Sequence, residues 1–332
     1  MRSRYGAHSV EEIVWQDFAI KSLGETRGLL FTTMTITKAV LPVAGLGTRL
    51  LPATKSQPKE MLPVGHKPVV QYVVEELVGQ GIDTFLFVTA RKKGSIEDHF
   101  DDDDPELDAR LSSSEAVETG LVDFAARKVG FYYVRQRRPT GNADAVRLAA
   151  DFVGDQSFVV GFGDTIIHGP DRPGLVTRMT ESHVAHSASA TIGVWEVPPQ
   201  DTRKYGVVKP APGHGAGGDD FPIVDIVEKP GPESAPSCLA VAARYVFTPA
   251  IFDAIDAVSS GLGGERWLTD AIHILLARGE TVRCVRLRPD EWRYDIGTPL
   301  TYYRAFVDFA LADPEHGPEF TRYLRDKLGD TR

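Results

Sequence analysis

The segment from Lys38 to Pro63, KAVLPVAGLGTRLLPATKSQPKEMLP, constrains the fold more than any other part of the chain. Its apolar, β-branched start predicts a buried strand that leads directly into a turn containing Gly45 and Gly47. A strand that opens into a glycine-rich loop places backbone N–H groups at the carboxyl edge of a sheet. Open α/β sheets bind nucleotides at that edge.

Three cations, Arg49, Lys55 and Lys59, follow the glycine turn and suit a polyphosphate ligand. The common phosphate loops do not fit this pattern. A Walker A loop needs Gly-Lys-Ser/Thr, and a dinucleotide fingerprint needs a small residue where Leu50 stands. A turn with a purely structural role would not explain three cations between apolar flanks. The segment therefore predicts a phosphate-binding loop of another type.

The same segment resembles the signature of the sugar-1-phosphate nucleotidylyltransferases. Its letters match AGxGTR, PATK and PKEMLP at residues 44–49, 52–55 and 58–63. Within that family it is most similar to the bacterial UTP–glucose-1-phosphate uridylyltransferases, and the resemblance covers roughly residues 36 to 310. It implies Mg²⁺-dependent transfer of a uridylyl group from UTP to α-D-glucose 1-phosphate, giving UDP-glucose and pyrophosphate.

Composition limits the partners and the compartment. The chain has 332 residues, 42% of them hydrophobic, and a net charge of -9, which argues against nucleic-acid or anionic-membrane partners. Its two cysteines, Cys238 and Cys284, are too few for a disulfide framework or a zinc cluster. No apolar run is long enough to span a bilayer. We therefore expect a protein of the reducing cytoplasm.

The resemblance also sets the expected domain boundaries. Residues 1–33 lack the features of a signal peptide and precede the matching region, so we expect a poorly ordered extension, although Trp15 and Phe18 could pack onto a surface. Residues 34–332 are expected to form a single nucleotidyltransferase domain. The resemblance further implies a homo-oligomer, either a dimer or a tetramer.

Strands and helices alternate after the first loop. This order predicts an α/β fold with a doubly wound, mostly parallel, Rossmann-like sheet. Closely spaced strands between about 194 and 246 predict a small mixed β lobe over the active site, and the Gly/Pro-rich residues 210–220 predict a connection inside it. The acidic run Asp101–Asp104 is interpreted as a solvated loop. Strands are expected at residues 39–43, 84–89, 128–134, 157–160, 190–197, 240–247 and 281–287, and helices at 69–79, 268–278 and 302–312.

Two aspartates are candidate metal ligands. Asp164 ends an apolar strand, and Asp295 lies just before a turn glycine. The resemblance assigns both to Mg²⁺ binding, whereas a helix cap or an Asx-turn is the alternative for either residue alone. Nucleotidyl transfer needs alignment and positive charge rather than a strong base, because the attacking phosphate oxygen is already anionic.

The resemblance also assigns the substrate-binding residues. Lys229 in the EKP motif would bind the sugar phosphate, Glu228 would accept sugar hydroxyls, and Gly206 in YGVV would line the sugar through its backbone. From the residues alone, an exposed charged pair before a proline is the simpler interpretation of EKP. The predicted nucleotide site consists of Ala44, Gly45, Gly47, Thr48, Arg49, Lys59, Gln136 and Gly141. The predicted catalytic set consists of Arg49, Lys59, Asp164, Lys229 and Asp295.

The chain departs from the family pattern near these pockets. Relatives carry GLGHAV where this chain has GNADAV at residues 141–146, so Ala143 and Asp144 differ from the pattern. Thr165 and Ala243 are two further departures outside this segment. The GE-x-x-LTDAI motif is kept, with Trp267 in a variable place and capping by Thr269 or Asp270 as the expected role of its polar residues.

These departures concern the choice of base and sugar more than the reaction. One alternative is therefore a nucleotidylyltransferase for dTTP or another triphosphate, or for another sugar or cyclitol 1-phosphate. A second alternative is a non-catalytic sugar-nucleotide-binding regulator, which would have no need for both carboxylates Asp164 and Asp295.

Overall fold

The computed structural model describes residues 35–101, 127–170, 173–215, 217–259 and 264–329. All described residues belong to one compact unit, Thr35–Arg332. The predicted N-terminal extension, residues 1–33, lies outside the described residues. Most of the acidic run Asp101–Asp104 lies outside them too.

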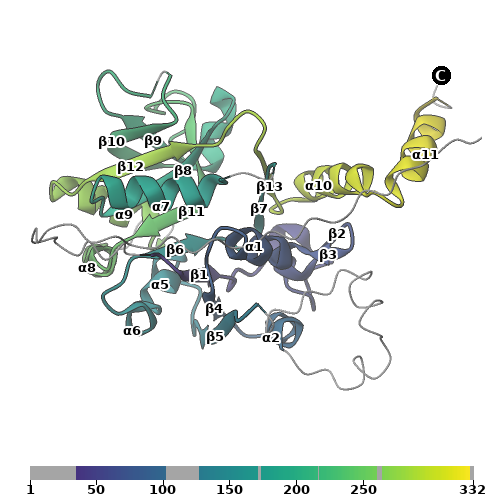
Figure 1. The fold of residues 1–332 in the computed structure, drawn as a ribbon, viewed down its shortest axis with the longest axis horizontal. Coiled ribbons are helices and arrows are strands. Elements are labelled where there is room, and N and C mark those ends of the chain that lie inside the picture. The colour runs from purple at the N-terminus through teal and green to yellow at the C-terminus, as the bar shows by residue number, and fades with distance from the viewer. Residues whose placement is uncertain (1–34, 102–126, 171–172, 216, 260–263, 330–332) are drawn as a thin grey trace, which may run out of the picture. The chain divides into compact units, whose positions relative to one another are not determined.

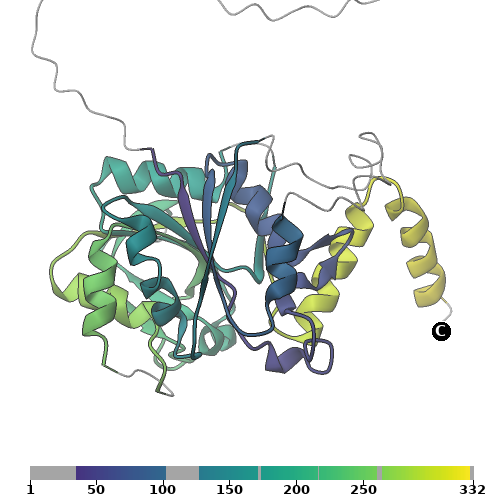
Figure 2. The ribbon, with the colours of Figure 1, turned by 90° about the horizontal axis from the view of Figure 1, so that it is seen from below.

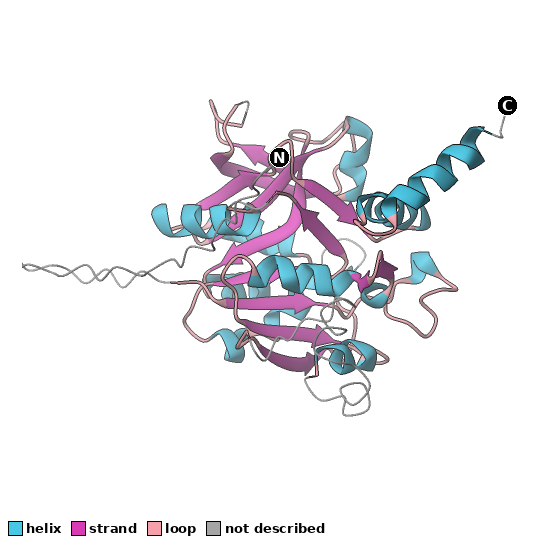
Figure 3. Cartoon of the chain, turned by 45° about the vertical axis from the view of Figure 1, so that its right-hand side comes forward, coloured by secondary structure: helices cyan, strands magenta, loops and turns pink. Residues whose placement is uncertain are grey.

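A nine-stranded sheet forms the centre of the described residues (Figure 1), in the order β5-β4-β1-β6-β11-β8-β12-β10-β9. Figure 3 shows these strands as one twisted series. The strands are β1 (Lys38–Pro42), β4 (Thr84–Thr89), β5 (Gly130–Arg135), β6 (Phe158–Gly161), β8 (Ala190–Glu196), β9 (Gly206–Pro210), β10 (Asp220–Glu228), β11 (Leu239–Phe247) and β12 (Val282–Arg286).

The sheet is mixed, so the prediction of a mostly parallel sheet is wrong. β5, β4, β1 and β6 run parallel to one another, and β12 runs parallel to β8. In contrast, β11 is antiparallel to both β6 and β8, and β10 is antiparallel to β12 and β9. Parallel neighbours need a long crossover, usually a helix. The described residues between β9 and β11 contain no helix, and β9 connects to β10 as an antiparallel hairpin.

The segment predicted as a small β lobe contributes strands to this same sheet. β8 and β11 are interior strands, and β9 with β10 forms a hairpin at one edge. The hairpin connection includes the Gly/Pro-rich stretch 211–219, as the sequence predicted. The α/β class is confirmed, whereas the strands of this segment are continuous with the main sheet.

Helices pack on both faces of the sheet (Figure 2). Because side chains alternate across a strand, Val40 joins the buried cluster with α5, α8 and α9, whereas Leu41 joins the cluster with α1, α2 and α7. The helices are α1 (Val69–Val78), α2 (Gly94–Phe100), α5 (Asn142–Arg147), α6 (Ala150–Val153), α7 (Leu175–Ala185), α8 (Ala250–Ala257), α9 (Leu268–Ala277), α10 (Pro299–Ala312) and α11 (Gly317–Gly329). No helix among the described residues is long and apolar enough to cross a bilayer.

Several short elements lie beside the main sheet and contain some of the predicted site residues. β7 (Thr165–His168) pairs with β13 (Trp292–Asp295), and β2 (Pro63–Val64) pairs with β3 (Lys67–Pro68). Single 3₁₀ turns occur at η1 (Thr48–Leu50) and η2 (Lys59–Met61), and a longer one at η3 (Pro199–Lys204). A third buried cluster, which includes Leu50, Ile166 and Ile296, joins the first loop to β7 and to the residue after β13.

Candidate active site

The β7–β13 ladder brings the two predicted metal ligands together. Asp295 is the register partner of Thr165, which directly follows Asp164. The amide of Ile296 also donates to the carbonyl oxygen of Asp164 at 2.9 Å. Two carboxylates far apart in the sequence are therefore held side by side by backbone hydrogen bonds, as the sequence predicted for ligands of one site.

Lys59, on η2, forms an ion pair with Asp164. Both side chains are largely buried. Burial alone would lower the pKa of Lys59, but the carboxylates of Asp164 and Glu60 outweigh it and raise the pKa to about 12. Lys59 is therefore a permanent cation at neutral pH, at the position where the first loop meets the carboxylates.

The two carboxylates have opposite pKa shifts. Burial tends to raise the pKa of Asp164, but the charges of Lys59 and Arg293 hold it below its ordinary value. Burial raises the pKa of Asp295, and the nearby negative charge of Asp164 raises it further, against the attraction of Arg293. Two neighbouring carboxylates resist being ionised at the same time, so the Asp164–Asp295 pair favours binding of an additional cation.

The donor set fits Mg²⁺ shared with a substrate better than a metal cage built from protein alone. The described residues contain no group of three or more His, Cys, Asp or Glu side chains that could hold an ion. Mg²⁺ in phosphate-transfer sites usually takes one or two carboxylates, with the remaining ligands from phosphates and water. Asp164 and Asp295 supply such a pair.

Arg49 lies beside Asp295. A Cβ built at Gly297 would lie 3.0 Å from Asp295 Oδ1 and 3.2 Å from Arg49 Nη2, so both groups border this glycine. The turn before Arg49 needs a glycine, because Gly47 has φ 65° and its carbonyl accepts a 2.7 Å hydrogen bond from Thr54. The loop therefore directs its arginine to the carboxylate pair.

Gly45 lies against the Lys59 side chain. A Cβ at this position would be 3.5 Å from Lys59 Nζ. Behind it, Lys93 Nζ binds Glu60 Oε2 at 2.7 Å in a pair that is almost inaccessible to solvent. This pair anchors the 3₁₀ turn that carries Lys59. The sequence analysis missed Lys93, since nothing in its surrounding residues marks it as a partner of Glu60.

The next predicted nucleotide residues lie on a separate loop. The Gln136 amide donates to the Gly141 carbonyl at 3.2 Å, so one of its two donor hydrogens is used by the backbone. Gly141 has φ 119°, and a Cβ there would lie 2.1 Å from the carbonyl oxygen of Arg266. Only glycine fits at position 141, because the backbone of Arg266 lies directly against it.

The unusual residues of this loop contact the segment 266–268. Asn142 Oδ1 accepts a 2.8 Å hydrogen bond from the Leu268 amide at the start of α9. Asp144 pairs with Arg266 at 3.3 Å. Asp144 thus has a cationic partner within the protein. The expected capping of α9 by Thr269 or Asp270 is wrong, because Asn142 supplies that acceptor from another part of the chain.

The predicted sugar-phosphate residues cluster at the end of β10. Lys229 Nζ lies 3.1 Å from Glu228 Oε1 and 3.9 Å from the centre of the Trp267 ring. Thr269 donates to the other oxygen of Glu228 at 3.0 Å. A Cβ at Gly206 would lie 2.6 Å from the Thr269 methyl group, so this glycine is needed for packing.

Arg293 is a further cation that the sequence analysis missed. Its guanidinium lies 5.3 Å from the ring centre of Trp195 and 5.0 Å from that of Tyr205, and its charge acts on both aspartates. Arg293 and Asp295 share a face of β13 because they are two residues apart. That spacing is the sequence signal that could have identified it.

A buried ion pair supports the carboxylates from behind. Arg244 is fully buried and binds Glu76 of α1, with Nη2–Oε2 at 2.5 Å and Nε–Oε1 at 3.1 Å. Its Nη2 also donates to the carbonyl of Thr165 at 2.9 Å. Arg244 therefore joins α1 and β11 to the strand that positions Asp164.

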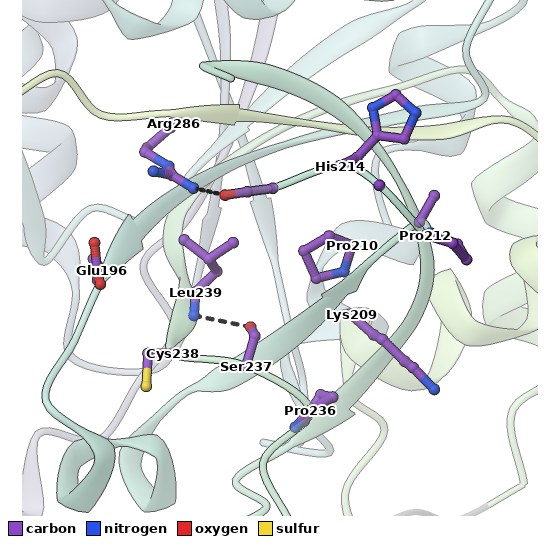
Figure 4. A pocket seen from close by; sticks show the side chains of 13 residues that line it. Glu196, Lys209, Pro210, Pro212, His214, Pro236, Ser237, Cys238, Leu239 and Arg286 are labelled. Carbon is purple, nitrogen blue, oxygen red and sulfur yellow. Dashed lines mark hydrogen bonds between the residues drawn. The ribbon is translucent and has the colours of Figure 1, made fainter. Parts of the chain in front are cut away.

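Two hollows lie apart from the predicted catalytic residues. One of about 520 Å³ lies beside the β9–β10 hairpin, where Lys209, His214, Cys238 and Arg286 contribute to its lining (Figure 4). The other, of about 650 Å³, includes Glu76 but none of the predicted catalytic residues. Neither hollow contains the carboxylate pair, so the candidate site rests on convergent side chains rather than on cavity size.

Comparison with known proteins identifies the family to which the chain belongs. A family model described as nucleotidyl transferase matches residues 38–311. A UTP–glucose-1-phosphate uridylyltransferase of Bacillus subtilis is 40% identical over 294 residues, which are 88% of this chain and 94% of that protein. One from Streptococcus pneumoniae is 38% identical over 296 residues, covering 88% of this chain and 96% of the relative.

Solved structures are similar as well. A UTP-bound UGPase from Acinetobacter baumannii superposes with a TM-score of 0.78 at 35% identity, over 87% of this chain and 99% of that one. A UDP-glucose pyrophosphorylase complexed with UDP-glucose superposes with a TM-score of 0.73 at 32% identity, over 84% of this chain and 100% of the other. The likeness therefore covers the sheet and the site together.

Proposed function

This chain belongs to the nucleotidyl transferase family, and from that membership we propose that it is a UTP–glucose-1-phosphate uridylyltransferase. The reaction gives UDP-glucose and pyrophosphate from UTP and α-D-glucose 1-phosphate. The observation that carries the proposal is the convergence of Arg49 and Lys59, from the glycine loop, on the carboxylates Asp164 and Asp295. The relatives with this activity match nearly the whole chain.

The proposed chemistry is an in-line displacement at the α-phosphorus of UTP. An oxygen of the sugar phosphate forms a bond to that phosphorus, and the bond to the bridging oxygen of the β-phosphate breaks. Pyrophosphate leaves with the electron pair. The nucleophile is already anionic, so the protein's task is to align the two phosphates and to neutralise the developing charge.

We assign the phosphate contacts to cations of three segments. Arg49 suits two oxygens of the leaving pyrophosphate, because a guanidinium donates in a fork. Lys59 is charged at neutral pH and is positioned by Asp164, so it can contact the triphosphate without losing its carboxylate partner. Lys229 suits the sugar phosphate, and Glu228 suits the sugar hydroxyls.

The divalent metal of this family has a natural place at the carboxylate pair. We propose Mg²⁺ as the ion and Asp164 and Asp295 as the residues that would hold it, because two carboxylates leave room for phosphate and water ligands. When bound, the ion supplies positive charge to the phosphates of both substrates. Burial, with a smaller contribution from the charge of Asp164, raises the pKa of Asp295, as expected for a buried carboxylate kept beside another for a cation.

Base recognition is assigned to the first loop and to Gln136. Backbone groups of Ala44, Gly45, Gly47 and Thr48 in the first loop, and of Gly141 on the separate loop after Gln136, would contact the nucleotide. Gln136 retains its amide oxygen and one donor hydrogen after bonding Gly141, which suits a pyrimidine edge. Thymine shares that edge with uracil, so dTTP is the triphosphate to compare with UTP.

A second candidate substrate is another sugar or cyclitol 1-phosphate. It is favoured by one observation: Asn142 and Asp144, which depart from the family pattern, contact the segment that carries Trp267 beside Lys229. A non-catalytic binder is disfavoured, since binding alone would not require two mutually repelling carboxylates. We further propose a homo-oligomer, dimer or tetramer, and, from the unpaired Cys238 and Cys284, a reducing compartment such as the cytoplasm.

The test is pyrophosphate release with Mg²⁺ across a grid of nucleoside triphosphates and sugar 1-phosphates. A maximum at UTP with glucose 1-phosphate supports the proposal. A maximum elsewhere in the grid replaces the substrates while keeping the reaction. Asp164→Asn and Lys229→Ala serve as active-site controls, and unchanged turnover in both variants would overturn the assigned site.

A further inference from the structure

The ammonium of Lys229 is held before any substrate arrives. It lies 3.9 Å from the centre of the Trp267 ring and 3.1 Å from Glu228 Oε1. The backbone of Lys229 is fixed too, since it has φ 48° and its amide donates to the carbonyl of Tyr205 at 3.0 Å. The lysine therefore turns a sharp corner at the end of β10 with its side chain directed at the indole.

The segment that carries Trp267 is itself fastened on both sides of the indole. The amide of Arg266 donates to Thr140 O at 2.9 Å, and the carbonyl of Arg266 accepts from the Ala143 amide at 3.1 Å. The Leu268 amide is bound by Asn142 at 2.8 Å. These backbone contacts, with the Asp144–Arg266 pair, leave the indole little freedom to move.

A neutral ring suits this role better than a second carboxylate would. An aromatic face attracts an ammonium through its quadrupole and carries no net charge. A second acid beside Lys229 would hold the ammonium as well, but it would repel the phosphate that the lysine is assigned to bind. The indole therefore restricts the many rotamers of a lysine while leaving the site attractive to an anion.

We propose that Trp267 is a positioning residue for the sugar phosphate, which acts by holding Lys229 ready to bind it. The contacts of residues 140–144 with residues 266–268 fix the indole in this place. This inference rests on the proposed transfer reaction and names a residue that the sequence pattern leaves variable. The gain is preorganisation: the ordering of Lys229 is complete before the substrate binds.

The experiment compares steady-state kinetics of the wild type with Trp267→Leu and Trp267→Phe. With Trp267→Leu, the KM for glucose 1-phosphate is expected to rise by about threefold to thirtyfold, the range of a cation–π contact. The KM for UTP should stay unchanged. Trp267→Phe keeps an aromatic face, so its KM for glucose 1-phosphate should rise much less than that of Trp267→Leu. Trp292→Leu, at a tryptophan that is 59% exposed, is the matched control and should behave as wild type.

A double variant distinguishes an effect that acts through Lys229 from a merely structural effect. If the indole acts through Lys229, Trp267→Leu should add nothing to the KM of a Lys229→Met enzyme. Equal increases in both KM values, or full additivity in the double variant, would overturn the inference. If the leucine variant fails to fold, the phenylalanine variant is tested instead. Its KM for glucose 1-phosphate should rise by a smaller factor, and its KM for UTP should again stay unchanged.

The outcomes separate this inference from the proposed function. An active wild type whose KM for glucose 1-phosphate is insensitive to Trp267 overturns the inference alone. A wild type that releases no pyrophosphate with any substrate pair overturns the proposed function, and the inference with it.

Discussion

The two halves of the candidate site are built in different ways. The carboxylate pair, Asp164 and Asp295, is held by a backbone ladder and by buried groups behind it. The Lys229 corner, which consists of Glu228, Lys229 and Trp267, is held mainly by contacts between side chains, and Lys229 is one-third exposed. The first arrangement depends on the backbone and on the buried Arg244 behind it, whereas the second depends on partly exposed side chains.

This difference matches some of the chain's departures from its family pattern. Substitutions at Asn142, Asp144 and Trp267 change contacts around the Lys229 corner. Thr165 departs from the pattern as well, but its backbone still pairs with Asp295 in the ladder. Transfer chemistry needs the same metal geometry for every substrate, while the choice of sugar depends on local side chains. A fold that keeps the carboxylate pair apart from the Lys229 corner can change the choice of sugar without losing the transfer chemistry.

The largest expected effect comes from breaking the support behind the carboxylate pair. Arg244→Met leaves Glu76 buried without its partner and is expected to lower the free energy of unfolding by about 3–5 kcal/mol. Denaturant unfolding measures this loss. Because the β7–β13 ladder remains, the kcat of the folded fraction should fall far less than the stability does.

The control for that variant replaces both partners. Arg244→Met combined with Glu76→Leu removes the unpaired charge and should recover more than half of the lost stability, since an apolar pair can replace a buried ion pair. If Arg244→Met alone cost less than about 1 kcal/mol, the arginine would not be the anchor described here.

Next come the carboxylates themselves. Asp164→Asn and Asp295→Asn are each expected to lower kcat by about 10²–10³-fold, as for loss of one electrostatic contact in a reaction centre. Their effects on the stability of the ligand-free protein should have opposite signs. The melting temperature at neutral pH should fall for Asp164→Asn and rise for Asp295→Asn.

The opposite signs follow from the pKa shifts. The pKa of Asp164 is lowered, so its ionised form stabilises the fold above the ordinary value of 3.8, and this contribution is lost as the pH falls through the lowered value. The pKa of Asp295 is raised, so its ionised form opposes folding at neutral pH and protonation relieves it. Thermal melts between pH 3 and 8 test this, and equal shifts of the same sign would contradict it.

A smaller effect is expected where the 140–144 loop meets α9. Asn142→Ala removes the acceptor for the Leu268 amide and should cost about 1 kcal/mol, as loss of a helix cap does. Asn142→Asp keeps an acceptor and should cost little. The KM for glucose 1-phosphate should rise in Asn142→Ala by less than in Trp267→Leu, and a rise in the KM for UTP alone would show that the loop serves the nucleotide instead.

The smallest effect is expected at Ala243, a buried residue of β11 with φ 61° at a register shift. Ala243→Gly relieves about 1–2 kcal/mol of left-handed strain but removes a buried methyl group worth about 0.8 kcal/mol. The net change in unfolding free energy should stay below about 1 kcal/mol, with kinetics unchanged. Altered substrate preference in this variant would make Ala243 part of the specificity machinery.

Much of the fold follows from local pattern. The strand expected at 84–89 matches β4, and the helix expected at 69–79 matches α1 to within one residue, because each has a clear apolar period. The direction of β11 could not be predicted, since strand polarity depends on how distant segments pair. An apolar run of residues is compatible with either a parallel or an antiparallel ladder.

The site was predictable where an element boundary marks a residue. Asp164 comes after an apolar strand and Asp295 before a glycine, so both lie where strands end. Arg244 and Asn142 have partners far away in the sequence, and no local motif marks such pairs. Contacts that cross between elements, including the Trp267–Lys229 contact, became visible only in three dimensions.

The β7–β13 ladder also has a consequence for synthesis of the protein. It joins Asp164 to Asp295, and 295 − 164 = 131 residues separate them. At ribosomal rates this stretch takes roughly 7–26 s to make. Throughout that interval the nascent chain carries its glycine loop and one aspartate, yet the partner strand does not exist. The growing polypeptide therefore lacks the proposed carboxylate pair until the ribosome has passed β13, however early the first strands fold.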